Sequence, residues 1–211
     1  MGDTLAVLYD HYKDTCGTIA DAIRRRERLM LLLIGALGLF AFQTAFPTET
    51  NLALSEFLSF KFGFTLSVGL SVVETVIWFI FLILMVRYFQ TVALIERRYT
   101  YIHQIEVYLN KHLDGEFITR EGKAYSDEYP LFSRWTTFLY AVVFPVLLLG
   151  ASIAKITYDW VVALPQCPPS VYLILDSIAF VLVAISIVLY MTMIHWPSKP
   201  SEANTPPTEK S

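Results

Sequence analysis

The sequence has little charge and almost no cysteine. Charged residues make up 17% of its 211 residues, whereas soluble domains carry roughly 25%. Its two cysteines, Cys16 and Cys167, are too few for a disulfide framework or a cysteine-rich metal site. The net charge of −3 is small and identifies no partner.

The sequence also lacks the motifs of common enzymes. It has no Gly-rich phosphate loop, no G-x-S-x-G elbow and no HExxH pair. The histidines are scattered among three segments, as His11, His103, His112 and His195. We therefore expect no catalytic residues, no bound metal and no cofactor.

Long apolar runs are what the sequence does have. Hydrophobic residues make up 55% of the chain. They form four runs of about 18–24 residues, and about 20 residues of helix cross a bilayer core. The runs are Leu29–Phe46, Phe64–Val86, Trp135–Ala154 and Val171–Ile194. We expect an all-α integral membrane protein whose first run is retained, since no signal-peptide cleavage site follows it.

The basic residues predict the orientation of these spans. Fourteen of the sixteen Lys and Arg residues lie before the first run, between the second and third, or after the fourth. Only Lys61 and Lys155 lie in the other two loops. The positive-inside rule then places both termini in the cytoplasm. This topology puts Cys16 and Cys167 on opposite sides of the membrane, so they cannot pair within one chain.

The spans divide the chain into segments of different character. Residues 1–28 have the spacing of an amphipathic cytoplasmic helix, and 29–86 hold the first two spans with a short external loop. In that loop Asn51 could cap a short helix through Leu58. Residues 87–134 predict a cytoplasmic helix to about Leu113 and a small hairpin. Residues 135–196 hold the last two spans, and 197–211 have the composition of a disordered tail.

Apolar side chains of the cytoplasmic helix recur at three- and four-residue steps. This stripe contains Val92, Ile95, Tyr99, Ile102 and Leu109. It has two interpretations: it packs on the amphipathic helix of the same chain, or it forms an oligomer seam between copies. Both can hold at once.

Glu74 is the most informative single residue. An ionisable group near the middle of a span is costly and by default marks a functional site. Ser67, Ser71, Glu74 and Thr75 share one small, polar helix face, which predicts a pore lining. The alternatives are a packing seam in which Glu74 is protonated, and proton-coupled transport. Asp176, only about a turn inside the fourth span, favours a structural role.

Two further features have weaker functional interpretations. Pro145 leaves the carbonyl of Ala141 without its helical partner and predicts a kink, which could act as a hinge. Basic residues among tyrosines could contact a cytoplasmic ligand or nucleic acid: Arg97, Arg98, Lys111, Arg120 and Lys123. However, residues 87–134 contain seven basic and seven acidic residues, and membrane topology alone explains the bases.

Three stretches carry a resemblance. Residues 117–125 (FITREGKAY), residues 129–135 (YPLFSRW), and Tyr140 with Phe144-Pro145 resemble small uncharacterised bacterial four-span membrane proteins. The size and layout are similar to membrane effectors of bacterial anti-phage defence, including the channel subunit of the Hailong system. The resemblance implies a homo-oligomeric channel of the inner membrane, controlled by a cytoplasmic regulatory protein or an oligonucleotide. The competing functions are a non-conducting scaffold or signalling protein, and a small transporter.

Overall fold

The computed structural model describes residues 2–62, 70–112, 135, 138–163 and 169–195. The described part of the chain is helical and contains no strand. Its elements are α1 (Gly2–Ala45), α2 (Pro47–Phe62), α3 (Leu70–His112), the π-helical turn η1 (Leu139–Val143), α6 (Phe144–Ala163) and α7 (Val171–His195). Four helices are long and apolar enough to cross a membrane, namely α1, α3, η1 with α6, and α7. The prediction of an all-helical chain with four such helices is confirmed.

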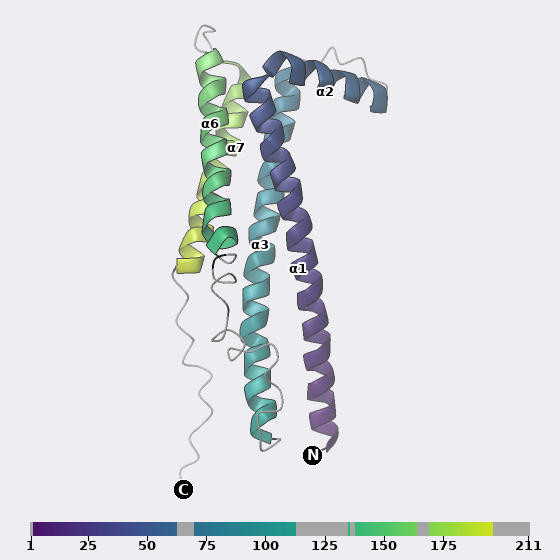
Figure 1. Cartoon of the computed structure of the whole chain (residues 1–211). Coiled ribbons are helices and arrows are strands. Elements are labelled where there is room, and N and C mark those ends of the chain that lie inside the picture. The colour runs from purple at the N-terminus through teal and green to yellow at the C-terminus, as the bar shows by residue number, and fades with distance from the viewer. Residues whose placement is uncertain (1, 63–69, 113–134, 136–137, 164–168, 196–211) are drawn as a thin grey trace.

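Two of these helices are much longer than a membrane is thick. The 44 residues of α1 and the 43 residues of α3 each extend about 65 Å at 1.5 Å per residue. Figure 1 shows α1 and α3 running side by side beyond the end of α6 and α7. We call this extension the stalk, and define it as residues 2–28 of α1 with residues 87–112 of α3. At the opposite end, α2 turns away from the bundle, and we call that end the α2 end.

Aromatic side chains fill the interior of the four-helix bundle. The Phe40 ring lies 4.8 Å from Trp78 and 5.1 Å from Phe81, measured between ring centroids. Where the stalk joins the bundle, Phe89 of α3 stacks on Tyr190 of α7 at 4.1 Å. Trp78 and Phe81 are fully buried. Aromatic contacts of this kind join α1, α3 and α7 into one packed core.

The third span differs from its prediction at its far end. The sequence predicted a span ending at Ala154, but α6 continues to Ala163. Lys155 therefore lies inside the helix, where only 2% of it is exposed. Its placement in an external loop was wrong, because a single charged residue does not end a helix whose neighbours can pair with it.

Pro145 has a visible effect on the helix that contains it. Proline has no N–H to donate, so the turn before it must find another hydrogen-bond pattern. The helix widens there into η1, in which the N–H of Phe144 donates to the carbonyl of Leu139. Pro145 itself is fully buried. The hydrogen-bond pattern of the helix changes at this turn, whereas the predicted kink and the role of Pro145 as a hinge stay predictions.

The first loop is more helical than expected. Helix α2 begins at Pro47 and ends at Phe62, whereas the sequence predicted a short helix from Asn51 to Leu58. Proline is favoured in the first turn of a helix, since its missing N–H would have no helical partner there. The predicted hairpin, the tail 197–211 and Cys167 lie outside the described residues.

The stalk is held together by the apolar stripe that the sequence predicted. Ile102 and Leu109 of α3 are fully buried against α1, together with Tyr12 and Ile19. Glu106, the polar residue within the stripe, is also buried and accepts a hydrogen bond of 3.0 Å from the Tyr12 hydroxyl. Burial and the neighbouring Glu106 raise the pKa of the Tyr12 hydroxyl above its ordinary value.

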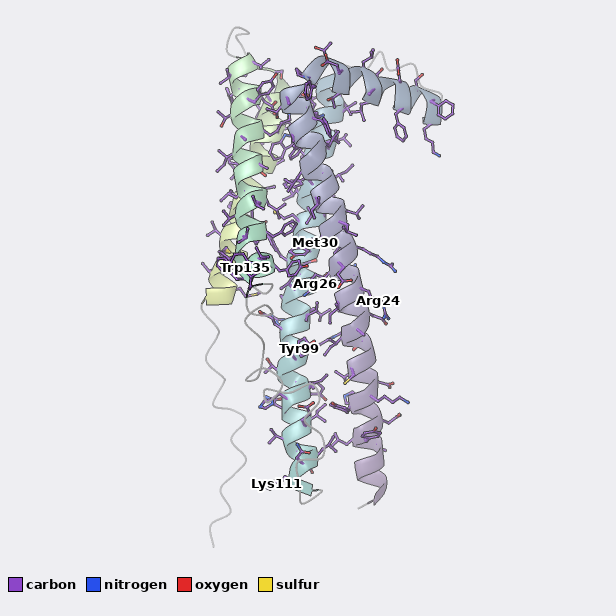
Figure 2. The ribbon with its side chains drawn as sticks, viewed as in Figure 1. Arg24, Arg26, Met30, Tyr99, Lys111 and Trp135 are labelled. Atoms are coloured by element: carbon purple, nitrogen blue, oxygen red, sulfur yellow. The ribbon has the colours of Figure 1, made fainter. Side chains whose placement is uncertain are left out.

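The stalk and the bundle meet at a basic position. Figure 2 shows Arg26 near the level where Trp135 lies, with Tyr99 and Lys111 farther along the stalk. The Arg26 guanidinium lies 5.6 Å from the centroid of the Tyr140 ring, which is within the range of a cation–π contact. This contact fixes α1 against the start of η1.

Candidate functional site

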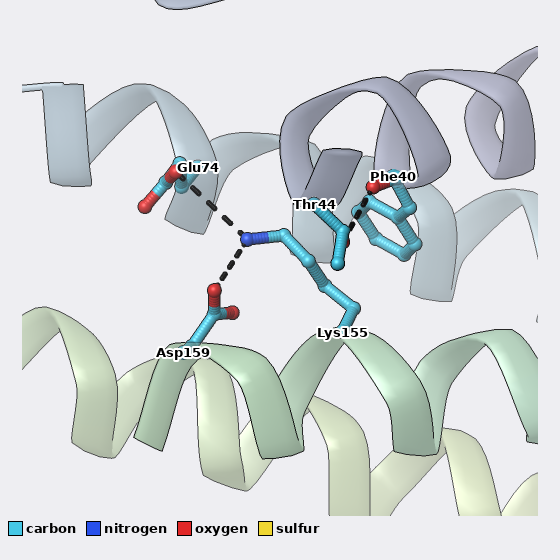
Figure 3. Close-up of polar contacts among 5 residues, drawn as sticks. All are labelled: Phe40, Thr44, Glu74, Lys155 and Asp159. Carbon is cyan, nitrogen blue, oxygen red and sulfur yellow. Dashed lines mark hydrogen bonds and ion pairs between the residues drawn. The ribbon is translucent and has the colours of Figure 1, made fainter. Parts of the chain in front are cut away.

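A buried lysine lies at the centre of the candidate site. The Nζ atom of Lys155 donates a hydrogen bond of 2.6 Å to Oδ1 of Asp159, one turn farther along α6. The same Nζ lies 3.8 Å from Oε1 of Glu74 on α3. Figure 3 shows the lysine reaching from α6 toward Glu74, with Asp159 beside it. An ammonium group buried among apolar helices needs such partners, because an unpaired charge there is very costly.

The carboxyl groups lie closer to solvent than the lysine does. The side chain of Glu74 is 27% exposed and that of Asp159 is 13% exposed, against 2% for Lys155. The three groups therefore form a graded arrangement, with the ammonium on the inner side. Behind them, Trp78 and Leu148 close the bundle interior.

Two more polar side chains join the site from the other helices. Asp176 of α7 is 4% exposed, and Gln43 of α1 is 2% exposed. Neither amide atom of Gln43 has a hydrogen-bond partner, and neither has Oδ1 of Asp176. Buried polar atoms are almost always hydrogen-bonded, so these three atoms call for an explanation.

These groups surround a cavity of about 250 Å³ at the α2 end. Gln43, Ser71, Glu74, Asp159 and Asp176 line it together with residues at helix ends, which include Pro47, Ala163 and Ser170. All four spanning helices thus contribute to one polar cavity. Glu74 was expected near the middle of its span, and the cavity shows that it lies nearer the α2 end.

The charges of the site do not balance. Glu74, Asp159 and Asp176 can carry three negative charges, and Lys155 supplies one positive charge. Excess negative charge in a surface cavity attracts cations and repels anions. Among the described residues, no three His, Cys, Asp or Glu side chains are placed to hold a metal ion directly. The arrangement fits a loosely held cation better than a chelated metal.

The predicted pore-lining residues lie in different places in the structure. Ser71 and Glu74 line the cavity, and Thr75 is buried in the bundle. Ser67 lies outside the described residues. Asp176, expected to have only a structural role near the interface, lies in the same cavity as Glu74.

The structure describes three of the five predicted cytoplasmic contact residues. Arg98 donates a hydrogen bond of 2.9 Å to the backbone carbonyl of Thr18 and so holds the stalk together. Arg97 and Lys111 are exposed, and Arg120 and Lys123 lie outside the described residues. Binding of a ligand or nucleic acid to these residues stays a prediction.

The predicted oligomer seam is mostly covered within the chain. Ile95, Ile102 and Leu109 are buried, and Val92 packs partly buried against the bundle core. Tyr99 is the exposed member, at 36%. The structure favours the intrachain interpretation for the buried residues, and contact between copies through Tyr99 stays a prediction.

Sequence reasoning missed three members of the site. Lys155 and Asp159 were assigned to a loop, although their four-residue spacing is that of an ion pair on one helix face. Gln43 was overlooked because it lies inside an apolar run. A single amide in such a run is a weak signal that becomes informative only when the helices facing it are known.

Comparison with known proteins adds no family to this description. No protein-family model, curated protein sequence or solved structure matches the chain.

Proposed function

We propose that the protein is a homo-oligomeric cation channel whose acidic cavity forms the entrance of the conducting path. One observation carries the proposal: Glu74, Lys155, Asp159 and Asp176 gather from three helices inside the membrane-spanning bundle. Ionisable groups at such places are rare, and they mark ion pathways, proton relays or ligand sites. Carboxylates that line an entrance favour cations over anions.

The proposed channel needs more than one copy of the chain. Trp78, Phe81 and Met85 are completely buried and fill the middle of a single bundle. A packed aromatic core holds no chain of water molecules, so the path beyond the cavity would form between copies. This is the reason for proposing an oligomer, whose mass and symmetry in detergent would be the first measurements.

Transport is the second candidate, and the shape of the cavity favours it. The cavity lies at the α2 end, and the aromatic core lies between it and the stalk. A site open to one side of the membrane is expected in one state of an alternating-access transporter. A transporter would move cations in vesicle flux measurements without unitary current steps.

The biological setting is proposed from the resemblance. Membrane effectors of anti-phage defence would depolarise an infected bacterial cell, and this chain would do so from the inner membrane. The stalk, which extends away from the bundle, would then receive the signal from a regulatory protein or an oligonucleotide. Detection of such a partner on the stalk is a separate question from conduction.

Conduction is tested by recording from purified protein in planar bilayers. We expect a wild-type oligomer to prefer K⁺ over Cl⁻, and Glu74→Gln to reduce this preference severalfold, because glutamine keeps the size but removes the charge. Glu56→Gln on exposed α2 serves as the matched control and should leave the preference unchanged. An oligomer that passes no current, even with cytosol of the source cell on the stalk side, would contradict the channel proposal. The interpretation as a non-conducting scaffold would then remain.

Orientation is tested by labelling single cysteines in cells. The background lacks Cys16 and Cys167, and a cysteine replaces either Glu56 on α2 or Asp14 on the stalk, both exposed. With the stalk in the cytoplasm, as the basic residues predict, an impermeant thiol reagent should label position 56 and spare position 14. The opposite pattern would place the cavity on the cytoplasmic side and reverse the proposed direction of ion entry.

A further inference from the structure

The unpartnered atoms of the cavity point to a ligand. Gln43 is 98% buried and Asp176 is 96% buried, yet both line the cavity with polar atoms that bond to no other protein group. Gln43 comes from α1 and Asp176 from α7, and neither is a member of the Lys155 ion pairs between α3 and α6. Buried groups of this kind are satisfied by an ordered water molecule or a bound ion.

The charge of the cavity selects the sign of that ligand. Lys155 hydrogen-bonds directly to Asp159 and lies farther from Glu74, at 3.8 Å. Asp176 forms no ion pair within the described residues. With all carboxyl groups ionised, two negative charges remain after Lys155 is counted. A cation entering the cavity would lower this repulsion, and an anion would increase it.

The size of the cavity indicates whether the bound cation keeps its water molecules. About 250 Å³ is room for about eight water molecules at about 30 Å³ each. Tight Ca²⁺ sites wrap the ion in six to eight oxygens at about 2.3–2.6 Å, and among the described residues no three His, Cys, Asp or Glu side chains are placed to hold a metal ion directly. A roomy site with scattered oxygen atoms suits an ion that keeps most of its water.

From these observations we propose that the cavity binds one hydrated alkali cation, with Glu74, Asp176 and the amide oxygen of Gln43 as its protein partners. The site deepens the proposed function, on which it rests, because it is the place where the conducted ion would first bind. Gln43 supplies a neutral oxygen, and the two carboxyl groups supply the charge. Lys155 stays in its ion pairs and limits the site to a weakly held ion.

The test measures binding without measuring current. The midpoint of thermal unfolding of the purified full-length protein is followed while NaCl or KCl replaces N-methyl-D-glucamine chloride at constant ionic strength. Ligand bound only to the folded state raises the midpoint, and a rise of about 3 °C or more is expected at ten times the dissociation constant, growing further with the logarithm of the cation concentration. Asp176→Asn and, as a second variant, Gln43→Leu should lose most of this dependence. Asp21→Asn on the exposed stalk should keep it.

Each outcome is decisive for the site. An equal dependence on Na⁺ or K⁺ in wild type and in both cavity variants would overturn the proposal, and so would a rise with Mg²⁺ or Ca²⁺ alone. A cation-dependent midpoint in a protein that never conducts would keep the site and remove the channel. A conducting wild type whose midpoint ignores alkali cations would remove the site and keep the channel.

Discussion

Lys155→Met should lower the free energy of unfolding of the bundle by about 3–5 kcal/mol, the usual cost of removing one partner from a buried ion pair. The substitution keeps the length and apolar stem of the side chain, so packing changes little. It leaves Asp159 without the 2.6 Å hydrogen bond and leaves Glu74 and Asp176 without a nearby positive charge. Unfolding in detergent, followed by helical circular dichroism, measures the loss.

One further variant and the addition of alkali cations separate the effect of charge from that of packing. Lys155→Met combined with Asp159→Asn removes both partners of the shortest contact and should recover part of the lost stability, because less unpaired charge stays buried. Alkali cations should also recover part of the lost stability. They can enter the cavity and supply the positive charge that Lys155 no longer provides. If Lys155→Met were as stable as the wild type, with no added cation, the ion pairs would not be needed to hold the site.

The sequence predicts the helices of this protein far better than the contacts between them. Run length and composition are enough to find four spans, because the bilayer core requires about 20 apolar residues for each. The same rule misplaced Lys155. It treats a charged residue as the end of a span, whereas the structure pairs Lys155 with Glu74 from another helix. Such pairing depends on a neighbour that is far away in the sequence.

Only the part of the candidate site that lies on α3 was predicted from the sequence, because the rest depends on contacts between helices. Helical periodicity along α3 identified Ser71 and Glu74 as members of one polar face, and both line the cavity. Periodicity within one helix cannot show that Gln43 of α1 and Asp176 of α7 face the same point. The assembly of the site requires the order in which the helices pack around the core, and that order follows from complementary side-chain shapes rather than from any one helix.

The stalk illustrates the limit of an apolar stripe as evidence. The spacing of Ile95, Ile102 and Leu109 predicts that something covers this face, and it leaves open whether α1 or another copy does so. In the structure, Tyr12 and Ile19 of α1 lie against Ile102 and Leu109. Tyr99, which belongs to the same stripe by spacing, lies at the exposed margin.

Ile102→Asp should separate α1 from α3 along the stalk. Ile102 is completely buried between the two helices. Loss of such a side chain costs about 2–5 kcal/mol, and the carboxylate adds the cost of burying a charge. Beyond α6 and α7, the described part of the stalk consists of these two helices alone, so few other contacts offset this loss. Spin labels at the exposed positions Asp14 and Arg97 should report a longer and broader distance distribution in the variant.

Tyr99→Asp is the matched control, because it places the same charge on the same helix at an exposed position. It should leave the distance between α1 and α3 unchanged. If copies of the protein also meet through this side of the stalk, Tyr99→Asp should lower the oligomer mass while Ile102→Asp opens each stalk. An unchanged distance in Ile102→Asp would contradict the packing of α1 on α3. If both variants lowered the oligomer mass equally and left the distance between α1 and α3 unchanged, the whole stripe would be assigned to the interface between copies.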